Sequence, residues 1–569
     1  MDTTREAASG STLAGATPVT RVRTALRRDD GRLTTTGRVA VAVVSIAVFL
    51  TALDQTVVVT ALISMLQDIG LDVTQPDRAA WIISGYLLGY VIAMPLMGRV
   101  SDIYGRWRVF AICLAIFGIG SALCVLSPVL GGDIAPDYTT LGGAILTPLY
   151  DGAQGLLGLL HRLGVDTTYP ALDVLVGARF LQALGGGALV PVAMAVVGDL
   201  FGTSRRGLAL GLIGAVTEAG GVLGPVWGAW ITSTWGWQWI FTLNVPFAAV
   251  LFLAGFFTLP RGRGARERVD LIGALLFGAS LACLTIGLGQ QTGASGTFSL
   301  NAHVNVSPAL LVAAAVLFLL FIALELKVRW PVVEPALFRH AAFTGAALLS
   351  LIIGMTLIVA LVMIPLFIGT LVDTSPADGA IQSGLALLRM TALVPVGAIV
   401  GGWLSTRFGC RISAVLGVLC ASAGFWLMHL WPASVGWAQI TSATVVAGLG
   451  FGLVIAPIST SALNAARVTQ AGVASSVVTA LRMAGMILGL ATVTTWGLAR
   501  LRVLVAPYLK AGASPSAAVF TTSLHELYIE IFAVTALFTL LGILPALLLW
   551  RRRGRDADSA YESFVAPLV

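Results

Sequence analysis

Charged residues are scarce in this sequence. Asp, Glu, Lys and Arg make up 11% of the 569 residues, whereas soluble domains contain about 25%. Hydrophobic residues make up 57% of the chain, and the mean hydropathy is +0.92. This composition excludes an ordinary soluble protein and predicts an integral membrane protein. Because Gly and Pro occur inside many apolar runs, it favours membrane-spanning helices over a β-barrel.

Cysteine is also scarce, and its spacing excludes the usual cysteine-based sites. The five cysteines lie in or beside apolar segments without a C-x-x-C pair, so we predict packing residues and no disulfide framework or metal site. They are Cys113, Cys124, Cys283, Cys410 and Cys420. The sequence also lacks a phosphate-binding loop and a nucleophile triad. We therefore predict neither ATP hydrolysis nor catalysis, and no cofactor.

The apolar runs define the organisation of the chain. Residues 1–37 lack a signal-peptide cleavage pattern and predict a disordered, basic cytoplasmic tail. With this tail inside, most of the 34 Lys and Arg residues fall on the cytoplasmic side, which predicts that both termini are cytoplasmic. Fourteen apolar spans follow, near residues 39–66, 80–99, 109–130, 173–201, 207–232, 239–259, 269–290, 308–326, 342–371, 382–404, 412–430, 438–462, 473–498 and 528–550.

An internal repeat divides the spans into two halves. GRVSDIYGRWR (98–108) follows the second span and GWLSTRFGCR (402–411) follows the tenth, and both combine Gly, an aromatic residue and Arg. Two related halves around a midplane site are typical of alternating-access transporters. We predict an all-α integral membrane protein with 14 transmembrane helices arranged 6+2+6. The predicted domains are the tail 1–37, an N-terminal six-helix bundle 38–260, two inserted helices with linkers 261–335, a C-terminal six-helix bundle 336–551 and a cytoplasmic tail 552–569.

Two external segments interrupt this pattern. Residues 131–172 mix apolar residues with charges, and we predict one or two interfacial helices on the outer leaflet or folded over the external mouth. A tolerated loop insertion is the alternative. Residues 499–527 are predicted to extend the two flanking helices outward.

A single ionisable residue, Asp54, lies near the middle of the first span. A carboxylate at that depth costs about a few kcal/mol unless it is paired, hydrated or protonated. We interpret Asp54 as a proton- or ion-handling group. The alternative is a structural carboxylate that caps or crosslinks neighbouring helices.

Other polar residues lie inside the spans. Arg179 in the fourth span needs acceptors, such as Asp54 or backbone carbonyls, and Gln182 lies one turn away. Glu218 lies near mid-membrane in the fifth span. Arg482 in the thirteenth span also needs a carboxylate, and the second half has none well inside a span. Its candidate partners are therefore Asp54 and Glu218.

A bridge between the halves that breaks on protonation would couple proton uptake to opening, and a static structural pair is the alternative. The hypothesis assigns two sets of residues. The proton-coupling charge lock consists of Asp54, Glu218 and Arg482, and the intramembrane support consists of Arg179, Gln182 and Arg389.

Two further motifs concern packing and gating. The loop after the second span combines glycines for a tight turn with charges that can hold the cytoplasmic face shut. This predicted gating loop comprises Gly98, Asp102, Gly105, Arg106 and Arg108. In the fifth span, glycines admit a second helix closely and a proline kinks the helix. This predicted helix-packing motif comprises Gly220, Gly224, Pro225 and Gly228.

These motifs resemble a known family. LDQTVVVTAL, GRVSDIYGRWR, RFLQALGGG and GGVLGPVWG resemble successive signatures of the major facilitator superfamily, and WGWQWIFTLNVP (235–246) is similar to the sixth span of its 14-helix drug:proton antiporter branch. Ala183 stands where the family has Gly. Ile103 stands where the loop motif has Arg, which weakens the cytoplasmic charge cluster.

Within that branch, the sequence resembles the mycobacterial triacylglyceride exporter. The similar sequence segments include DRAAWIISGYLLGYVIAMPLMGRVSDIYGR and LRMAGMILG. The resemblance implies roles for Asp54, Glu218 and Arg482 in a proton-sensitive charge lock, and an extracytoplasmic lipoprotein as a partner. The insertion 131–172 and a shorter external loop at 431–437 set this chain apart.

The leading hypothesis is a proton-coupled antiporter that exports hydrophobic or lipid-like compounds such as triacylglycerides. We expect a monomer in the bacterial cell membrane whose partners are protons, this substrate and membrane lipids, with no nucleic acid. Methionines are predicted to line an adaptable cavity, although at helical spacing they also suit an ordinary core: Met355, Met363, Met390, Met483 and Met486. The alternatives are a multidrug:proton antiporter for amphiphilic cations and a non-transporting membrane scaffold or receptor.

Overall fold

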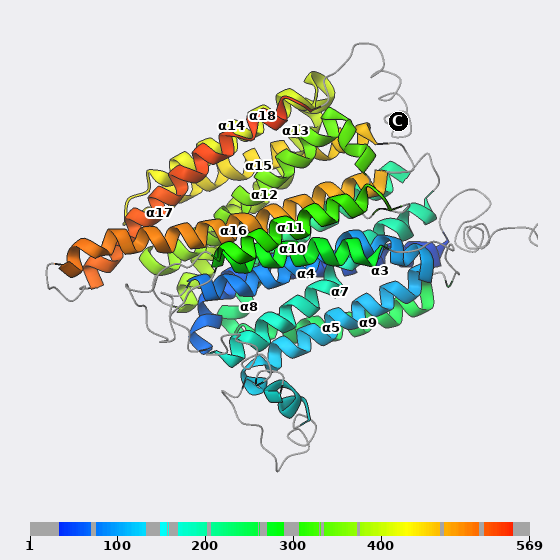
Figure 1. Ribbon diagram of the computed structural model, residues 1–569, viewed down its shortest axis with the longest axis horizontal. Helices are drawn as coiled ribbons and strands as arrows, with labels where there is room; N and C mark the ends of the chain where they lie inside the picture. Colours follow the sequence, from blue (N-terminus) through cyan, green and yellow to red (C-terminus); the bar gives the residue numbers. More distant parts are fainter. Residues whose placement is uncertain are drawn as a thin grey trace, which may run out of the picture. The chain divides into compact units, whose positions relative to one another are not determined.

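The computed structural model consists of α-helices and short helical turns over the residues that it describes (Figure 1). These residues are 34–69, 76–131, 148–155, 158, 169–201, 206–259, 261, 270–289, 307–328, 331, 335–372, 376–466, 471–510 and 517–549. The two predicted terminal tails, 1–37 and 552–569, lie almost wholly outside them.

A helix occupies each of the fourteen predicted spans. Nine of them begin before residue 350: α3 (Thr35–Asp68), α4 (Pro76–Tyr104), α5 (Arg106–Leu130), α7 (Pro170–Leu200), α8 (Arg206–Trp235), α9 (Gln238–Thr258), α10 (Leu271–Gly289), α11 (Pro308–Glu325) and α12 (Ala341–Phe367). The others are α13 (Pro376–Phe408), α14 (Cys410–His429), α15 (Trp437–Ala465), α16 (Ala471–Lys510) and α17 (Ala517–Leu540). Short turns accompany them: η2 (Pro335–Arg339), η3 (Ile368–Val372) and α18 (Ile543–Ala546).

Eleven of these helices are long and apolar enough, over their described residues, to cross a membrane. The remaining three are α4, α8 and α10. The apolar stretch is short in α4 (Ala80–Met94) and in α10 (Ile272–Leu288). The all-helical membrane architecture is confirmed, whereas fourteen crossings and two cytoplasmic termini stay predictions.

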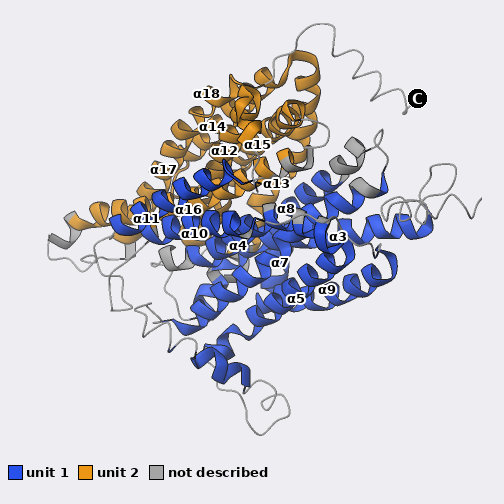
Figure 2. Ribbon diagram, turned by 45° about the vertical axis from the view of Figure 1, so that its right-hand side comes forward, with its two compact units in different colours: residues 1–287, 293–298, 307–332 blue, residues 288–292, 299–306, 333–569 orange. Residues whose placement is uncertain are grey.

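The helices form two compact units, coloured separately in Figure 2. Unit 1 comprises residues 1–287, 293–298 and 307–332, and unit 2 comprises residues 288–292, 299–306 and 333–569. In unit 1, α3 packs on α8, and α4 and α5 pack on α7. In unit 2, α12 packs on α16, and α15 contacts both α13 and α14. The domain boundaries derived from the sequence stay a prediction.

The two copies of the sequence repeat form the same turn. Gly105 between α4 and α5 has φ 94°, and Gly409 between α13 and α14 has φ 91°. Each amide donates to the carbonyl four residues earlier, on Ser101 and Ser405 respectively. Only glycine adopts such a φ without steric cost, which explains why both repeats place Gly here.

The glycines of α8 bring its backbone against α3. A side chain at Gly220, Gly224 or Gly228 would collide with the α3 backbone near Phe49, Leu53 or Val57. The predicted packing motif therefore lies at a helix contact, and its partner is α3. Close backbone approach through small residues is the usual way in which membrane helices associate.

A threonine of α3 compensates for the proline of α8. Pro225 has no N–H, so the carbonyl of Gly221 one turn earlier loses its normal helical partner. The Thr56 hydroxyl donates to this carbonyl at 3.0 Å. In addition, the Thr60 hydroxyl donates to the carbonyl of Pro225 at 3.0 Å. Since lipid offers no donors, the Thr56 bond supplies the partner that the Gly221 carbonyl lacks.

Unit 2 contains the same arrangement. Pro457 of α15 frees the carbonyl of Leu453, and the Ser413 hydroxyl of α14 donates to that carbonyl at 3.1 Å. In each unit, a neighbouring helix therefore satisfies a backbone group that a proline leaves without its partner.

The external segments are described only in part. Residues 148–155 of the insertion are helical, and Gln154 Nε2 donates to the Leu130 carbonyl at the end of α5 at 3.0 Å. Most of the remaining insertion lies outside the described residues, so its interfacial role stays a prediction. At the second segment, α16 continues to Lys510 and α17 begins at Ala517, which confirms the predicted extension of both helices.

Candidate functional site

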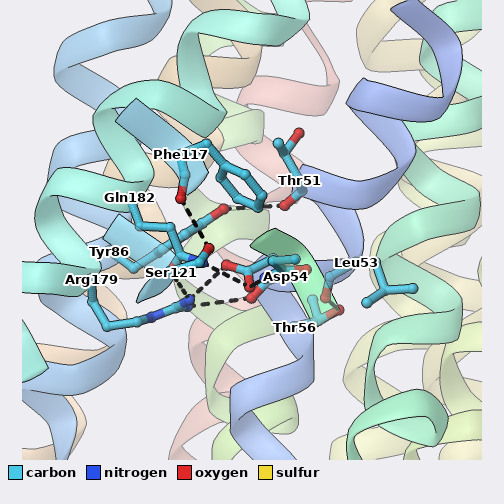
Figure 3. Close-up of polar contacts among 10 residues, drawn as sticks. Thr51, Leu53, Asp54, Thr56, Tyr86, Phe117, Ser121, Arg179 and Gln182 are labelled. Carbon is cyan, nitrogen blue, oxygen red and sulfur yellow. Dashed lines mark hydrogen bonds and ion pairs between the residues drawn. The ribbon is translucent and has the colours of Figure 1, made fainter. Parts of the chain in front are cut away.

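The candidate site surrounds Asp54 inside unit 1 (Figure 3). Asp54 lies at the twentieth position of the 34-residue α3 and is 0% exposed. Its side chain bonds directly to residues of α7 and α9. Gln182 of α7 also bonds to Ser121 of α5, which connects that helix to the network.

Arg179 of α7 forms an ion pair with Asp54. Its Nη1 lies 2.6 Å from Asp54 Oδ2, and its Nη2 donates to the backbone carbonyl of Asp54 at 3.3 Å. The side chains are 1% and 0% exposed. Arg179 thus donates to both kinds of acceptor predicted from the sequence, a carboxylate and a backbone carbonyl. A fully buried pair of this kind needs further hydrogen bonds to offset the loss of water.

Gln182 supplies several of these bonds. It lies three residues after Arg179, and therefore on the same face of α7. Its Oε1 accepts from Arg179 Nη1 at 2.6 Å, while its Nε2 donates to Asp54 Oδ1 at 3.1 Å. Nε2 also donates to Ser121 Oγ of α5 at 2.7 Å, and that hydroxyl donates to the Phe117 carbonyl. Gln182 therefore holds Asp54 and Arg179 in one connected network.

Asn244 of α9 completes the contacts of the carboxylate. Its Nδ2 donates to Asp54 Oδ1 at 2.7 Å, and the side chain is 4% exposed. Asn244 is not among the site residues predicted from the sequence. The available signal was an amide within the apolar run IFTLNVPFAAVLFL, where an unpaired polar group would be costly.

Aromatic rings cover the guanidinium. Arg179 Cζ lies 4.0 Å from the centroid of the Tyr86 ring and 5.4 Å from that of Phe241. The Tyr86 hydroxyl donates to the Thr51 carbonyl of α3 at 3.1 Å. A cation over a desolvated ring gains about 2 kcal/mol. These rings exclude water from the pair and fix the position of Arg179.

The contacts of Asp54 define what the site can do. Its two carboxylate oxygens face three donors, from Arg179, Gln182 and Asn244. A proton that arrives at Asp54 must therefore take the place of one of these donors. Protonation would change contacts with α7 or α9, so the network can convert a proton into a helix rearrangement.

The other predicted charge-lock residues are described within their own units. Glu218 is half-buried on α8, about 200° around the helix from Gly220, which faces α3. Arg482 is half-buried on α16 in unit 2, where Gly354 of α12 packs against its backbone. The proposed lock of Asp54, Glu218 and Arg482 stays a prediction.

Arg389 and the gating loop make local contacts. Arg389 Nη1 donates to the Leu385 carbonyl at 3.0 Å, and its Cζ lies 4.6 Å from the Trp437 ring centroid. Arg106 Nη1 donates to Ser101 Oγ at 2.6 Å, and Arg108 is exposed. The surroundings of Gly98 and the side chain of Asp102 lie outside what the structure describes. The gating role of this loop stays a prediction.

Comparisons with known proteins agree with this architecture. The triacylglyceride transporter of Mycolicibacterium hassiacum is 34% identical over 554 residues, which cover 92% of this chain and 94% of that protein. The triacylglyceride transporter of Mycobacterium tuberculosis is 33% identical over 542 residues, which cover 91% of this chain and 95% of that protein.

Solved structures show the same fold. An inward-facing bacterial homolog of the human lysosomal transporter Spinster matches with a TM-score of 0.56 at 15% identity, over 92% of this chain and 100% of that one. A D-xylose–proton symporter matches with a TM-score of 0.54 at 14% identity, over 89% of this chain and 97% of that one. The family model described as Major Facilitator Superfamily matches residues 44–490. The chain therefore belongs to the Major Facilitator Superfamily, a family of multi-pass membrane transporters and not of enzymes.

Proposed function

We propose that this protein exports hydrophobic or lipid-like molecules, such as triacylglycerides, in exchange for protons. Asp54 accepts the proton in this proposal. The observation that carries it is the buried network in which the Asp54 carboxylate accepts from Arg179, Gln182 and Asn244. A buried ion pair is weak evidence for stability alone, since apolar residues of similar size are often at least as stable. Its presence at mid-helix favours a role in coupling.

The substrate class is supported by the relatives. Two proteins named triacylglyceride transporters are 33–34% identical to this chain, and each match covers more than nine-tenths of both proteins. The methionines give less support to this substrate. Four of them are buried, which suits the alternative interpretation of an ordinary core: Met363, Met390, Met483 and Met486.

The second candidate is a multidrug:proton antiporter for amphiphilic cations. One observation favours it: the half-buried Glu218 on α8 offers a carboxylate within a predicted span. A carboxylate at such a position attracts cationic substrates. A neutral triacylglyceride has no group that would pair with it.

Transport in liposomes distinguishes these candidates. The purified chain is reconstituted, a pH gradient is imposed, and the movement of a fluorescent triacylglycerol is compared with that of a cationic dye. Lipid movement that depends on the gradient supports the proposal. Dye movement without lipid movement transfers support to the second candidate, and lipid movement that ignores the gradient refutes proton coupling.

Variants identify the coupling groups. Asp54→Asn is expected to abolish gradient-driven export while the protein folds, because the remaining side chain cannot exchange a proton. Glu218→Gln and Arg482→Gln test the charge lock, and each is expected to abolish export if the lock operates. Arg389→Gln is the matched control, since Arg389 contacts its own helix and Trp437. Wild-type rates in Asp54→Asn would remove Asp54 from the mechanism.

A further inference from the structure

We propose that Asn244 senses the protonation of Asp54 and transmits it to α9, which yields next to Pro246. The inference rests on the proposed function, because it assumes that Asp54 exchanges a proton during transport. It assigns to Asn244 a positioning role for α9, and no direct contact with the transported molecule.

Asn244 is the one polar side chain on the buried face of α9, a helix that the structure describes from end to end. The buried residues of this helix are Ile240, Phe241, Asn244, Ala248, Leu251 and Gly255. The rest of the face consists of apolar side chains and glycine, which contribute no directional bond. The hydrogen bond from Asn244 Nδ2 to Asp54 Oδ1, at 2.7 Å, is therefore the directional link between this face and α3.

The backbone of α9 is weakened one turn from this link. Pro246 lies inside the helix and has no N–H, so the carbonyl of Thr242 loses its normal helical donor. In α8 and α15, a neighbouring hydroxyl repairs the corresponding carbonyl. No side chain among the described residues donates to the Thr242 carbonyl. Residues 242–246 of α9 are therefore the point at which this helix can bend.

The groups around Asp54 leave Asn244 as the link that protonation can change most easily. Among the described residues, the charged and titratable side chains near Asp54 include Arg179 from α7, Tyr86 from α4 and Cys124 from α5. From α8, glycines face α3 at this level. Arg179 keeps a second bond, to the Asp54 carbonyl, and Gln182 keeps its bond to Ser121. Asn244 has no second donor bond among the described residues.

A proton on Asp54 Oδ1 places an O–H donor where Asn244 Nδ2 donates, so this bond is lost. The middle of α9 then has no polar link to α3 among the described residues, while Gln238 at the start of α9 still donates to Asp68, and the helix is free to bend at Pro246. While Asp54 is ionised, the same bond keeps α9 straight and docked. The state of one carboxylate is thereby converted into two positions of a helix.

Hydrogen exchange measured by mass spectrometry tests this proposal on the full-length protein in liposomes. Peptides that cover residues 240–252 are followed over a series of pH values, after correction for intrinsic exchange rates. In the wild type, protection is expected to fall as the pH is lowered. Asn244→Leu keeps the side-chain volume without the donor, and is expected to raise exchange near Pro246 about tenfold at high pH, the lower limit for a lost bond to a charged acceptor.

Three further variants make the result decisive. Asp54→Ala removes the acceptor together with the titrating group and is expected to remove the pH dependence, and Asn244→Leu added to Asp54→Ala is expected to cause no further change. Thr242→Ala is the control on the same helix, since its hydroxyl bonds only to the Gln238 carbonyl among the described residues, and it is expected to behave as the wild type. Asn244→Leu with wild-type pH dependence, or with an equal added effect in the Asp54→Ala background, would overturn the proposal.

Transport of a fluorescent triacylglycerol in the same liposomes separates this inference from the proposed function. Proton-driven transport together with α9 exchange that ignores Asn244→Leu refutes the inference alone. The predicted exchange pattern without lipid transport refutes the proposed substrate and leaves the role of Asn244 supported.

Discussion

The replacement of Arg179 by Leu tests how strongly the buried network depends on charge balance. Arg179 and Asp54 are 1% and 0% exposed and lie 2.6 Å apart. Removing one partner of such a pair leaves an uncompensated buried charge and costs about 3–5 kcal/mol. Since the total free energy of unfolding of a protein is about 5–15 kcal/mol, the loss is a large share of it.

The measurement is unfolding in mixed micelles with increasing sodium dodecyl sulfate, followed by tryptophan fluorescence. Arg389→Leu is the control, because this arginine has a bond to its own helix and a ring contact worth about 0.5–1 kcal/mol. The double variant Asp54→Asn with Arg179→Leu removes both charges, while the amide oxygen introduced at position 54 still accepts from Gln182 and Asn244. It is expected to regain about half of the lost free energy, since no unpaired charge stays buried.

Two outcomes would refute this reasoning. One is equal stability of Arg179→Leu and Arg389→Leu, which would mean that the buried position adds no cost. The other is a double variant as unstable as Arg179→Leu alone, which would assign the loss to packing against Tyr86 and Phe241 and not to the unpaired charge.

Two further predictions concern packing. Gly224→Ala places a Cβ against the Thr56 hydroxyl of α3 and is expected to reduce the free energy of unfolding by about 1–3 kcal/mol in the same assay. Gly221→Ala meets open space and serves as the control. Equal effects of the two variants would contradict the α3–α8 contact. Trp237→Phe removes the 2.7 Å bond from the indole to Asp68 Oδ2 and is expected to reduce the free energy of unfolding by about 1–2 kcal/mol. Asp68→Asn is expected to lose less, because its amide oxygen can still accept from the indole. No loss in Trp237→Phe would show that this bond is not formed in the membrane.

Part of the site could be predicted from the sequence because burial of a charge leaves few choices. Asp54 and Arg179 lie 125 residues apart, yet Asp54 needed donors and Arg179 needed a carboxylate or carbonyls at similar depth. Gln182 was predicted only as a polar residue of the same span that supports the buried charges. The glycines of α8 likewise indicated a close helix contact, although the sequence did not identify α3 as the partner.

Asn244 could not be predicted in the same way. A neutral amide can bond to its own helix, to another helix or to water, so the sequence imposes no single partner. Which face of α9 turns toward α3 depends on the packing of its apolar residues, such as Phe241 and Leu251, against neighbouring helices. Similarly, the hydropathy of α4 does not by itself establish a crossing, because its apolar stretch is only Ala80–Met94.

The bond from Thr56 to the Gly221 carbonyl has a consequence for how the chain is assembled in the bilayer. When α8 leaves the translocon, Pro225 leaves this carbonyl without a partner, and an unsatisfied backbone group in hydrocarbon costs several kcal/mol. The hydroxyl that satisfies it belongs to α3, a helix made more than a hundred residues earlier. Stable insertion of α8 and its docking onto α3 are therefore one step in biogenesis, and α3 serves as the template for α8.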